Sequence, residues 1–232
     1  MAQSPGDQIL ASPTMVKLTA RGTLLALGTV SSLVFAALAL VATRGIFDLD
    51  RSADALVGLT RSAGLQIPME AISLLGQASA LGPLIVLVSL LLWWRDRPRW
   101  ALALPVVMAG TGALQWMAKW AVDRPRPNGA PWGFPSGHAL TVVVFFGLIA
   151  YVVGTSAARR RWRLASGALC ALTVLAVGFS RLYLDVHWLS DVGGGFAVGG
   201  AYLPMAIWLV EGTPVGNDAL RPIQDAGYPV GA

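Results

Sequence analysis

Charged residues are scarce in this chain of 232 residues, because Asp, Glu, Lys and Arg together make up only 12% of it. An average soluble domain carries about 25% of such residues. The mean hydropathy is correspondingly high, at +0.63. This composition excludes an ordinary soluble globular domain and predicts an integral membrane protein.

Cysteine and histidine are scarce as well. The single cysteine, Cys170, cannot form an intrachain disulfide, and its apolar neighbours predict a buried, inert thiol. With two histidines and no convincing oxygen-rich or His/Cys cluster, the sequence predicts neither a metal site nor a cofactor. The basic residues behind the net charge of +5 lie in short clusters between apolar runs. We therefore expect no nucleic-acid partner and attribute these clusters to membrane topology.

Six apolar stretches are long enough to cross a bilayer, which takes about 20 helical residues. Lys17 and Arg21 precede the first stretch as in a signal peptide, but its length favours an uncleaved signal anchor. We predict an all-α fold, a six-transmembrane-helix bundle over residues 22–211, between an N-terminal tail at 1–21 and a flexible C-terminal tail at 212–232. The predicted spans are Gly22–Ala42, Ala71–Trp94, Trp100–Ala118, Gly137–Gly154, Leu164–Tyr183 and Val192–Val210.

The distribution of Lys and Arg between the loops predicts the orientation. With both termini in the cytoplasm of a plasma-membrane protein, the cytoplasmic flanks hold most of the basic residues that lie outside the motifs described below. Between the first two spans, Ile46 to Glu70 carries charges among apolar residues at helical spacing, which predicts a short helix on the outer surface. The cytoplasmic basic residues are Lys17, Arg21, Arg95, Arg97, Arg99, Arg159, Arg160, Arg161 and Arg163.

Two cations flank the predicted outer end of the third span. Lys119 and Arg126 belong to a Lys-x6-Arg-Pro string, in which Pro127 restricts the backbone after the arginine. A guanidinium matches the oxygens of a phosphate, and a lysine adds a point charge. Taken alone, both side chains could instead extend to the lipid headgroups.

The string Pro135-Ser136-Gly137-His138 opens the fourth span. Ser136 suits a helix N-cap, Gly137 removes steric bulk, and the free N–H groups of a first helical turn bind anions. His138 stands beside this predicted anion site and suits a general acid. The alternative is a capped helix with an interfacial histidine.

The third string is Ser180-Arg181-x5-His187-x3-Asp191. We expect Asp185 to cap the helix of the sixth span, with His187 and Asp191 at positions i and i+4 on one face of it. A carboxylate that accepts a hydrogen bond from Nδ1–H leaves Nε2 free, which would make His187 a nucleophile. The alternative is a His–Asp pair that only stabilises the helix.

The predicted topology places all three strings at the same non-cytoplasmic membrane edge, where ionisable groups are costly. Together they resemble the signature of the type-2 phosphatidic acid phosphatase superfamily, which includes lipid phosphate phosphatases and vanadium haloperoxidases. Every signature position matches between Lys119 and Asp191. The six-span layout also fits the membrane branch of that family.

This resemblance implies a catalytic set and a phosphate-binding set of residues. His187 would attack phosphorus and form a phosphohistidine, Asp191 would hold its imidazole, and His138 would protonate the leaving oxygen. Fixed cations would supply the charge stabilisation that a phosphoryl transition state needs, without a metal. The implied phosphate-binding residues are Lys119, Arg126, Ser136, Gly137 and Arg181.

We therefore predict a phosphatase that acts on a membrane lipid phosphate at the bilayer edge. Polyprenyl diphosphate of the undecaprenyl type, phosphatidylglycerophosphate and phosphatidic acid all remain candidate substrates. Two alternatives remain open: an enzyme like the vanadium haloperoxidases, which six spans disfavour, and a non-catalytic transporter that binds a phosphate headgroup. Gly195-x3-Gly199 could serve dimerisation or close packing inside one bundle, so the oligomeric state stays open.

Overall fold

The computed structural model describes residues 13–212, and their regular secondary structure is entirely α-helical. The predicted tails fall mostly on residues 1–12 and 213–232, outside the described part. Over the described residues the helices are α1 (Pro13–Ala42), α2 (Asp48–Gly58), α3 (Ala63–Leu74), α4 (Ala78–Trp94), α5 (Pro98–Ala121), α6 (Gly137–Gly154), α7 (Arg160–Tyr183) and α8 (Leu189–Gly212).

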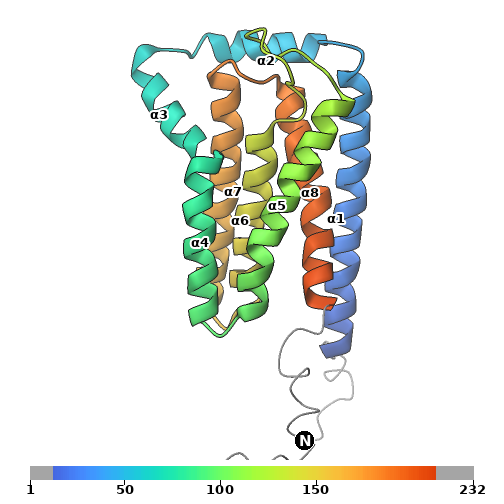
Figure 1. The fold of residues 1–232 in the computed structure, drawn as a ribbon, viewed down its shortest axis with the longest axis vertical. Coiled ribbons are helices and arrows are strands. Elements are labelled where there is room, and N and C mark those ends of the chain that lie inside the picture. The colour runs from blue at the N-terminus through green and yellow to red at the C-terminus, as the bar shows by residue number, and fades with distance from the viewer. Residues whose placement is uncertain (1–12, 213–232) are drawn as a thin grey trace, which may run out of the picture.

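The long helices form a single bundle of roughly parallel and antiparallel rods (Figure 1). Five helices of the described part are long and apolar enough to cross a membrane, namely those in α1, α5, α6, α7 and α8. The pair α3 and α4 makes a sixth span if it is counted as one. The all-helical membrane bundle predicted from the sequence is thus confirmed.

The second predicted span, Ala71–Trp94, is not one straight helix. It breaks between α3 and α4, whose axes differ by 46°. Gly76 lies in the break with its backbone against His138, and a Cβ atom there would come within 2.9 Å of the His138 Cβ. The break therefore lets the chain pass close to a residue of the predicted site.

The segment before this span contains two helices rather than the single short helix that we expected. The first, α2, lies across one end of the bundle, and α3 descends from it toward α4 (Figure 1). Leu49, Leu56 and Leu59 of this segment are exposed, whereas Asp50 is fully buried. A charged residue of α2 thus points into the bundle, which the surface-helix prediction did not include.

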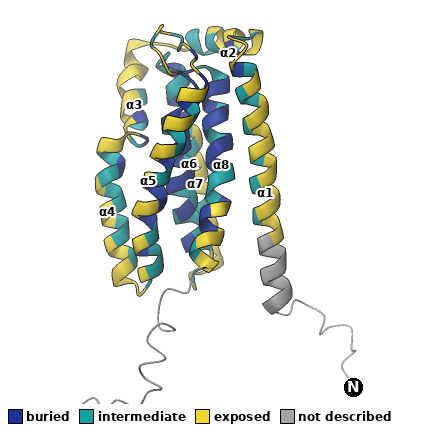
Figure 2. Ribbon diagram, turned by 45° about the vertical axis from the view of Figure 1, so that its right-hand side comes forward, coloured by how far each residue is buried: buried dark blue, intermediate teal, exposed yellow. Residues whose placement is uncertain are grey.

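The main hydrophobic core lies among α5, α6 and α8, and α6 and α8 carry more buried residues than the other helices of the described part (Figure 2). Gly195 and Gly199 bring α6 and α8 together, because Cβ atoms there would lie 2.5 Å from the Ser136 carbonyl oxygen and 2.9 Å from the Val143 Cβ. The glycine pair therefore serves close packing inside one bundle. The faces of α1 and α4 that point away from the bundle expose leucines and valines, as expected for surfaces that contact lipid tails.

Candidate active site

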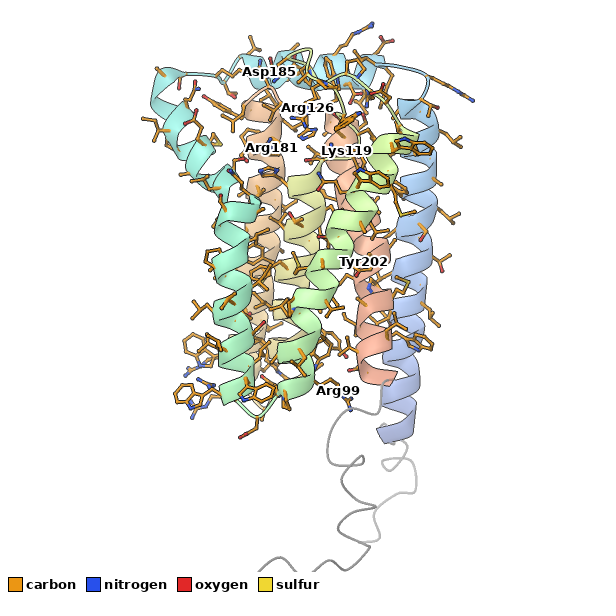
Figure 3. The ribbon with its side chains drawn as sticks, viewed as in Figure 1. Arg99, Lys119, Arg126, Arg181, Asp185 and Tyr202 are labelled. Carbon is orange, nitrogen blue, oxygen red and sulfur yellow. The ribbon has the colours of Figure 1, made fainter. Side chains whose placement is uncertain are left out.

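A cavity of about 590 Å³ brings the three sequence motifs together. Lys119, Arg126 and Arg181 gather at the end of the bundle that α2 covers, and Arg99 lies at the opposite end (Figure 3). Ser136 and Asp191 are fully buried next to the cavity. The predicted site residues that line the cavity are Lys119, Arg126, Gly137, His138, Arg181 and His187.

The cations reach the cavity from three different elements. Lys119 lies in the last turn of α5 and donates a hydrogen bond to the carbonyl oxygen of Trp132. Arg126 follows in the α5–α6 loop, where its backbone N–H donates to the Ala130 carbonyl at 2.8 Å. Arg181 lies in the last turn of α7 and donates to the Ser73 hydroxyl. None of the described residues that line this cavity is acidic, so its charge is positive.

Ser136 and Gly137 join α6 to α8 and α5. Ser136 occupies the N-cap position of α6 as predicted, but its hydroxyl makes no capping hydrogen bond with the described residues and is buried. Its backbone N–H instead donates to the Asp191 carbonyl at 2.9 Å, which ties the second motif to the third. A Cβ atom on Gly137 would lie 2.2 Å from the Gln115 side chain. Glycine therefore allows α5 to approach the N-terminus of α6.

His187 and Asp191 face each other, but not on one helix. His187 lies in the α7–α8 loop, two residues before α8 begins at Leu189. Its Nδ1 is 3.5 Å from Asp191 Oδ2, which also accepts the Trp188 N–H at 3.0 Å. Burial lowers the pKa of His187, although the Asp191 carboxylate opposes this shift. The imidazole is therefore neutral at neutral pH.

Asp185 does not cap α8, which corrects our prediction. Its backbone has a φ of 58°, and its carboxylate pairs with Arg61 at 3.3 Å. Arg61 also donates to the carbonyl oxygens of Leu182 and Tyr183 at 3.1 and 2.9 Å. The arginine thus binds the carbonyl groups at the C-terminus of α7 that a helix leaves unpaired. The N-terminus of α8 is instead capped from within, by Asp191 accepting the Trp188 N–H.

Two functional candidates were missed in the sequence. Arg124 precedes Pro125 as Arg126 precedes Pro127, so the chain has two Arg-Pro steps in series. Arg124 bonds to Asp191 Oδ1 at 3.0 Å rather than facing the cavity. Asp50 of α2 bonds to the same guanidinium. The repeated Arg-Pro step was the available signal for Arg124, and Asp50 had none beyond its charge.

The fold and this geometry define a helical membrane protein with a cationic, histidine-containing cavity at one end of the bundle. The PAP2 superfamily profile matches residues 100–213 of the chain. Phosphatidylglycerophosphatase B of Bacillus subtilis is 30% identical over 174 residues, which cover 69% of this chain and 83% of that protein. The chain therefore belongs to the PAP2 superfamily and to its membrane phosphatases.

A plant protein and two solved structures extend the comparison. Lipid phosphate phosphatase delta of Arabidopsis thaliana is 28% identical over 137 residues, 51% of this chain and 32% of the relative. The crystal structure of a transmembrane PAP2-type phosphatidylglycerolphosphate phosphatase from Bacillus subtilis matches with a TM-score of 0.73 and 24% identity, covering 82% of this chain and 98% of that chain. Aquifex aeolicus LpxE matches with a TM-score of 0.58 and 20% identity, over 70% and 96% of the two chains. These structures confirm the transmembrane helical fold.

Proposed function

We propose that the protein hydrolyses a phosphate or diphosphate monoester of a membrane lipid through a phosphohistidine intermediate. The observation that carries this proposal is the meeting of Lys119, Arg126 and Arg181 around one cavity with a His187–Asp191 pair behind it. Three fixed positive charges suit the equatorial oxygens of a transferring phosphoryl group. A neutral imidazole oriented by a carboxylate suits the in-line nucleophile.

The proposed reaction has two steps. Nε2 of His187 forms a bond to phosphorus while the bond from phosphorus to the lipid oxygen breaks. The imidazole of His138, protonated when the negatively charged phosphate occupies the cavity, gives its proton to that oxygen. A water molecule then attacks the phosphohistidine, the P–N bond breaks, and His138 accepts the proton of the water. Inorganic phosphate leaves, and His187 is neutral again. The placement of both histidines in the cavity lining supports this division of roles.

The shape of the cavity supports a lipid rather than a soluble substrate. Beyond its cationic end, the cavity continues between α4 and α5 along apolar side chains, among them Leu81, Ile85 and Met108. A phosphate held by the cations would leave its lipid tail between these helices. Phosphatidylglycerophosphate is the first substrate to test, because the Bacillus subtilis relative, 83% of which is matched by this chain, bears that activity in its name. Polyprenyl diphosphate and phosphatidic acid carry the same reacting group.

The orientation and the absence of a metal requirement are part of the proposal. Basic residues cluster at the end of the bundle opposite to the cavity, in the α4–α5 and α6–α7 connections. By the positive-inside rule this end is cytoplasmic, so the cavity faces the other side of the plasma membrane and both termini are cytoplasmic. The fixed cations provide the charge that Mg²⁺ supplies in other phosphoryl transfers.

The test is phosphate release by the purified full-length protein in detergent with EDTA. The panel contains phosphatidylglycerophosphate, a polyprenyl diphosphate, phosphatidic acid and a soluble phosphomonoester. His187→Ala removes the nucleophile, and Asp96→Asn, in the α4–α5 turn at the far end of the bundle, is the matched control. We expect release from at least one lipid, loss of release in His187→Ala and wild-type rates in the control. Undiminished release in His187→Ala, or no release from any lipid, would refute the proposal.

A further inference from the structure

A buried ionic cluster lies directly behind the His187–Asp191 pair, on the side away from the cavity. It consists of Asp50 from α2, Arg124 from the α5–α6 loop, and Ser190 and Asp191 from the first turn of α8. The side chains of Arg124, Asp50 and Asp191 are 1%, 0% and 0% exposed. A buried charge is stable only when it is paired and hydrogen-bonded, so the contacts within this cluster determine its geometry.

Arg124 holds both carboxylates of the cluster. One terminal nitrogen donates to Asp191 Oδ1 at 3.0 Å and to the Ser190 hydroxyl at 2.5 Å. The other donates to Asp50 Oδ2. Asp50 in turn accepts the backbone N–H and the hydroxyl of Ser190, both at 2.8 Å. The guanidinium thus lies between two carboxylates in a closed ring of hydrogen bonds.

The ring determines which oxygen of Asp191 is available to His187. Arg124 occupies Oδ1, so Oδ2 is left for the Trp188 N–H and for Nδ1 of His187. A planar guanidinium that donates to each carboxylate from a different nitrogen fixes the two carboxylates relative to each other more rigidly than a point charge would. With two carboxylates and one guanidinium, the cluster keeps a net negative charge next to the imidazole. If Asp191 were paired with Arg124 alone, its charge would be more fully neutralised.

We propose that Asp50 and Arg124 are positioning residues that set the orientation and the charge of Asp191, and through it the imidazole of His187. This inference rests on the proposed nucleophilic role of His187. If Asp50 has this role, helix α2 contributes to catalysis through it, since Asp50 is the residue by which α2 joins the cluster. Neither residue lines the cavity, so neither is expected to touch substrate.

The pH dependence of kcat/KM reports the charge around His187. A contact with a purely structural role would not shift this pH dependence. Asp50→Asn removes one negative charge and gives Arg124 wholly to Asp191. His187 then binds a proton less readily, so the acid limb of kcat/KM moves to lower pH, by at least about half a pH unit. The charged or titratable groups that face His187 are Asp191 on α8, Arg181 on α7, His138 on α6, Lys119 on α5 and Arg126 in the α5–α6 loop.

The experiment measures kcat, KM and the pH profile of phosphate release from the best lipid of the panel. For Asp50→Asn we expect kcat to fall at least about 10-fold with KM within about 3-fold, together with the shift of the acid limb. Asp48→Asn is the matched control on the same helix, because its carboxylate is fully exposed. Equal profiles for Asp48→Asn and Asp50→Asn would overturn the inference while leaving the phosphatase intact. A wild-type protein without lipid phosphatase activity would instead refute the proposed function.

A rescue experiment tests the charge balance separately. Arg124→Gln leaves two buried carboxylates next to each other without a cation, and adding Asp50→Asn removes one of these charges. We expect the double variant to be at least about 10-fold more active than Arg124→Gln alone. A double variant no better than Arg124→Gln would overturn the inference. If these variants do not fold, Arg124→Lys keeps the charge without the planar guanidinium, and a wild-type kcat in that variant would overturn it as well.

Discussion

Replacing Asp191 by asparagine should change the orientation and tautomer of the His187 imidazole without changing how the cavity binds the substrate. The change preserves side-chain volume but replaces one acceptor oxygen by an NH₂ donor. Asp191 accepts from Arg124 at 3.0 Å and from the Trp188 N–H at 3.0 Å, with Nδ1 of His187 at 3.5 Å. An asparagine has one acceptor oxygen, so it can accept either from Arg124 or from the Trp188 N–H and His187, but not from both sides.

The two orientations of the asparagine differ in cost. If its NH₂ faces Arg124, a buried cation loses an acceptor, which costs about 1–3 kcal/mol. If its oxygen faces Arg124, the NH₂ faces His187, and the imidazole must present its Nδ1 lone pair and carry its proton on Nε2. The second orientation leaves the Trp188 N–H without its acceptor, but losing an acceptor costs more for a charged guanidinium than for a neutral N–H, so this orientation is favoured. In it the attacking nitrogen is blocked. At the upper end of this range, a preference of about 3 kcal/mol leaves about one molecule in 10² with the reactive tautomer.

We therefore expect Asp191→Asn to lower kcat by about 10² or more, because the negative charge beside the imidazole is lost as well. KM should stay within about 3-fold, since Asp191 lies behind the cavity rather than in its lining. The assay is phosphate release from the best lipid substrate over a range of concentrations. Equal losses in kcat and in lipid affinity, or a kcat within about 3-fold of wild type, would contradict the tautomer argument.

Three further predictions concern the pH dependence, the inhibitors and the helix packing. Because burial lowers the pKa of His187, the acid limb of kcat/KM should lie below the ordinary value of about 6.5, and a limb above it would contradict a buried neutral nucleophile. Vanadate should inhibit competitively with the lipid and EDTA should not inhibit; activity lost in EDTA and restored by Mg²⁺ would refute the metal-free mechanism. Gly195→Ala should lower stability by about 1–3 kcal/mol in thermal unfolding, because its Cβ would lie 2.5 Å from the Ser136 carbonyl oxygen. Gly193→Ala is the control, with its nearest contact 3.4 Å away at Leu38, and equal losses in both variants would contradict this packing argument.

The sequence predicted the parts of the site that depend on local rules. The sequence predicted that one membrane edge holds Lys119, Arg126 and Arg181. Hydropathy shows where each apolar span ends, and because successive spans cross the membrane in opposite directions, it also shows which ends lie on the same side. The pairing of His187 with Asp191 was also predicted, although the helix that was to hold both residues begins after His187. The spacing was sufficient because Leu189 and Ser190, which lie between the two residues, already belong to the first turn of α8.

The errors arose where tertiary contacts outweigh local preference. Asp185 is a good N-cap by residue type, but Arg61 offers it a charged partner that sequence proximity does not reveal. Ser136 was expected to cap α6 with its hydroxyl, but its backbone is held by the Asp191 carbonyl. The bond between Arg124 and Asp50 joins residues 74 positions apart, so no local pattern could have indicated it.

The up-and-down order of the helices explains why a cationic cavity forms at this end of the bundle. The C-termini of α5 and α7 meet the N-termini of α6 and α8 there (Figure 1). A helix C-terminus carries partial negative charge and is stabilised by a cation, and Lys119 and Arg181 lie in the last turns of α5 and α7. A helix N-terminus carries partial positive charge, and Asp191 lies in the first turn of α8. Each ionisable group therefore stabilises its own helix end, and the same placement directs two cations and the N–H groups of α6 toward one cavity. Because these helix ends already meet, the α5–α6 loop has to add only the third cation, Arg126.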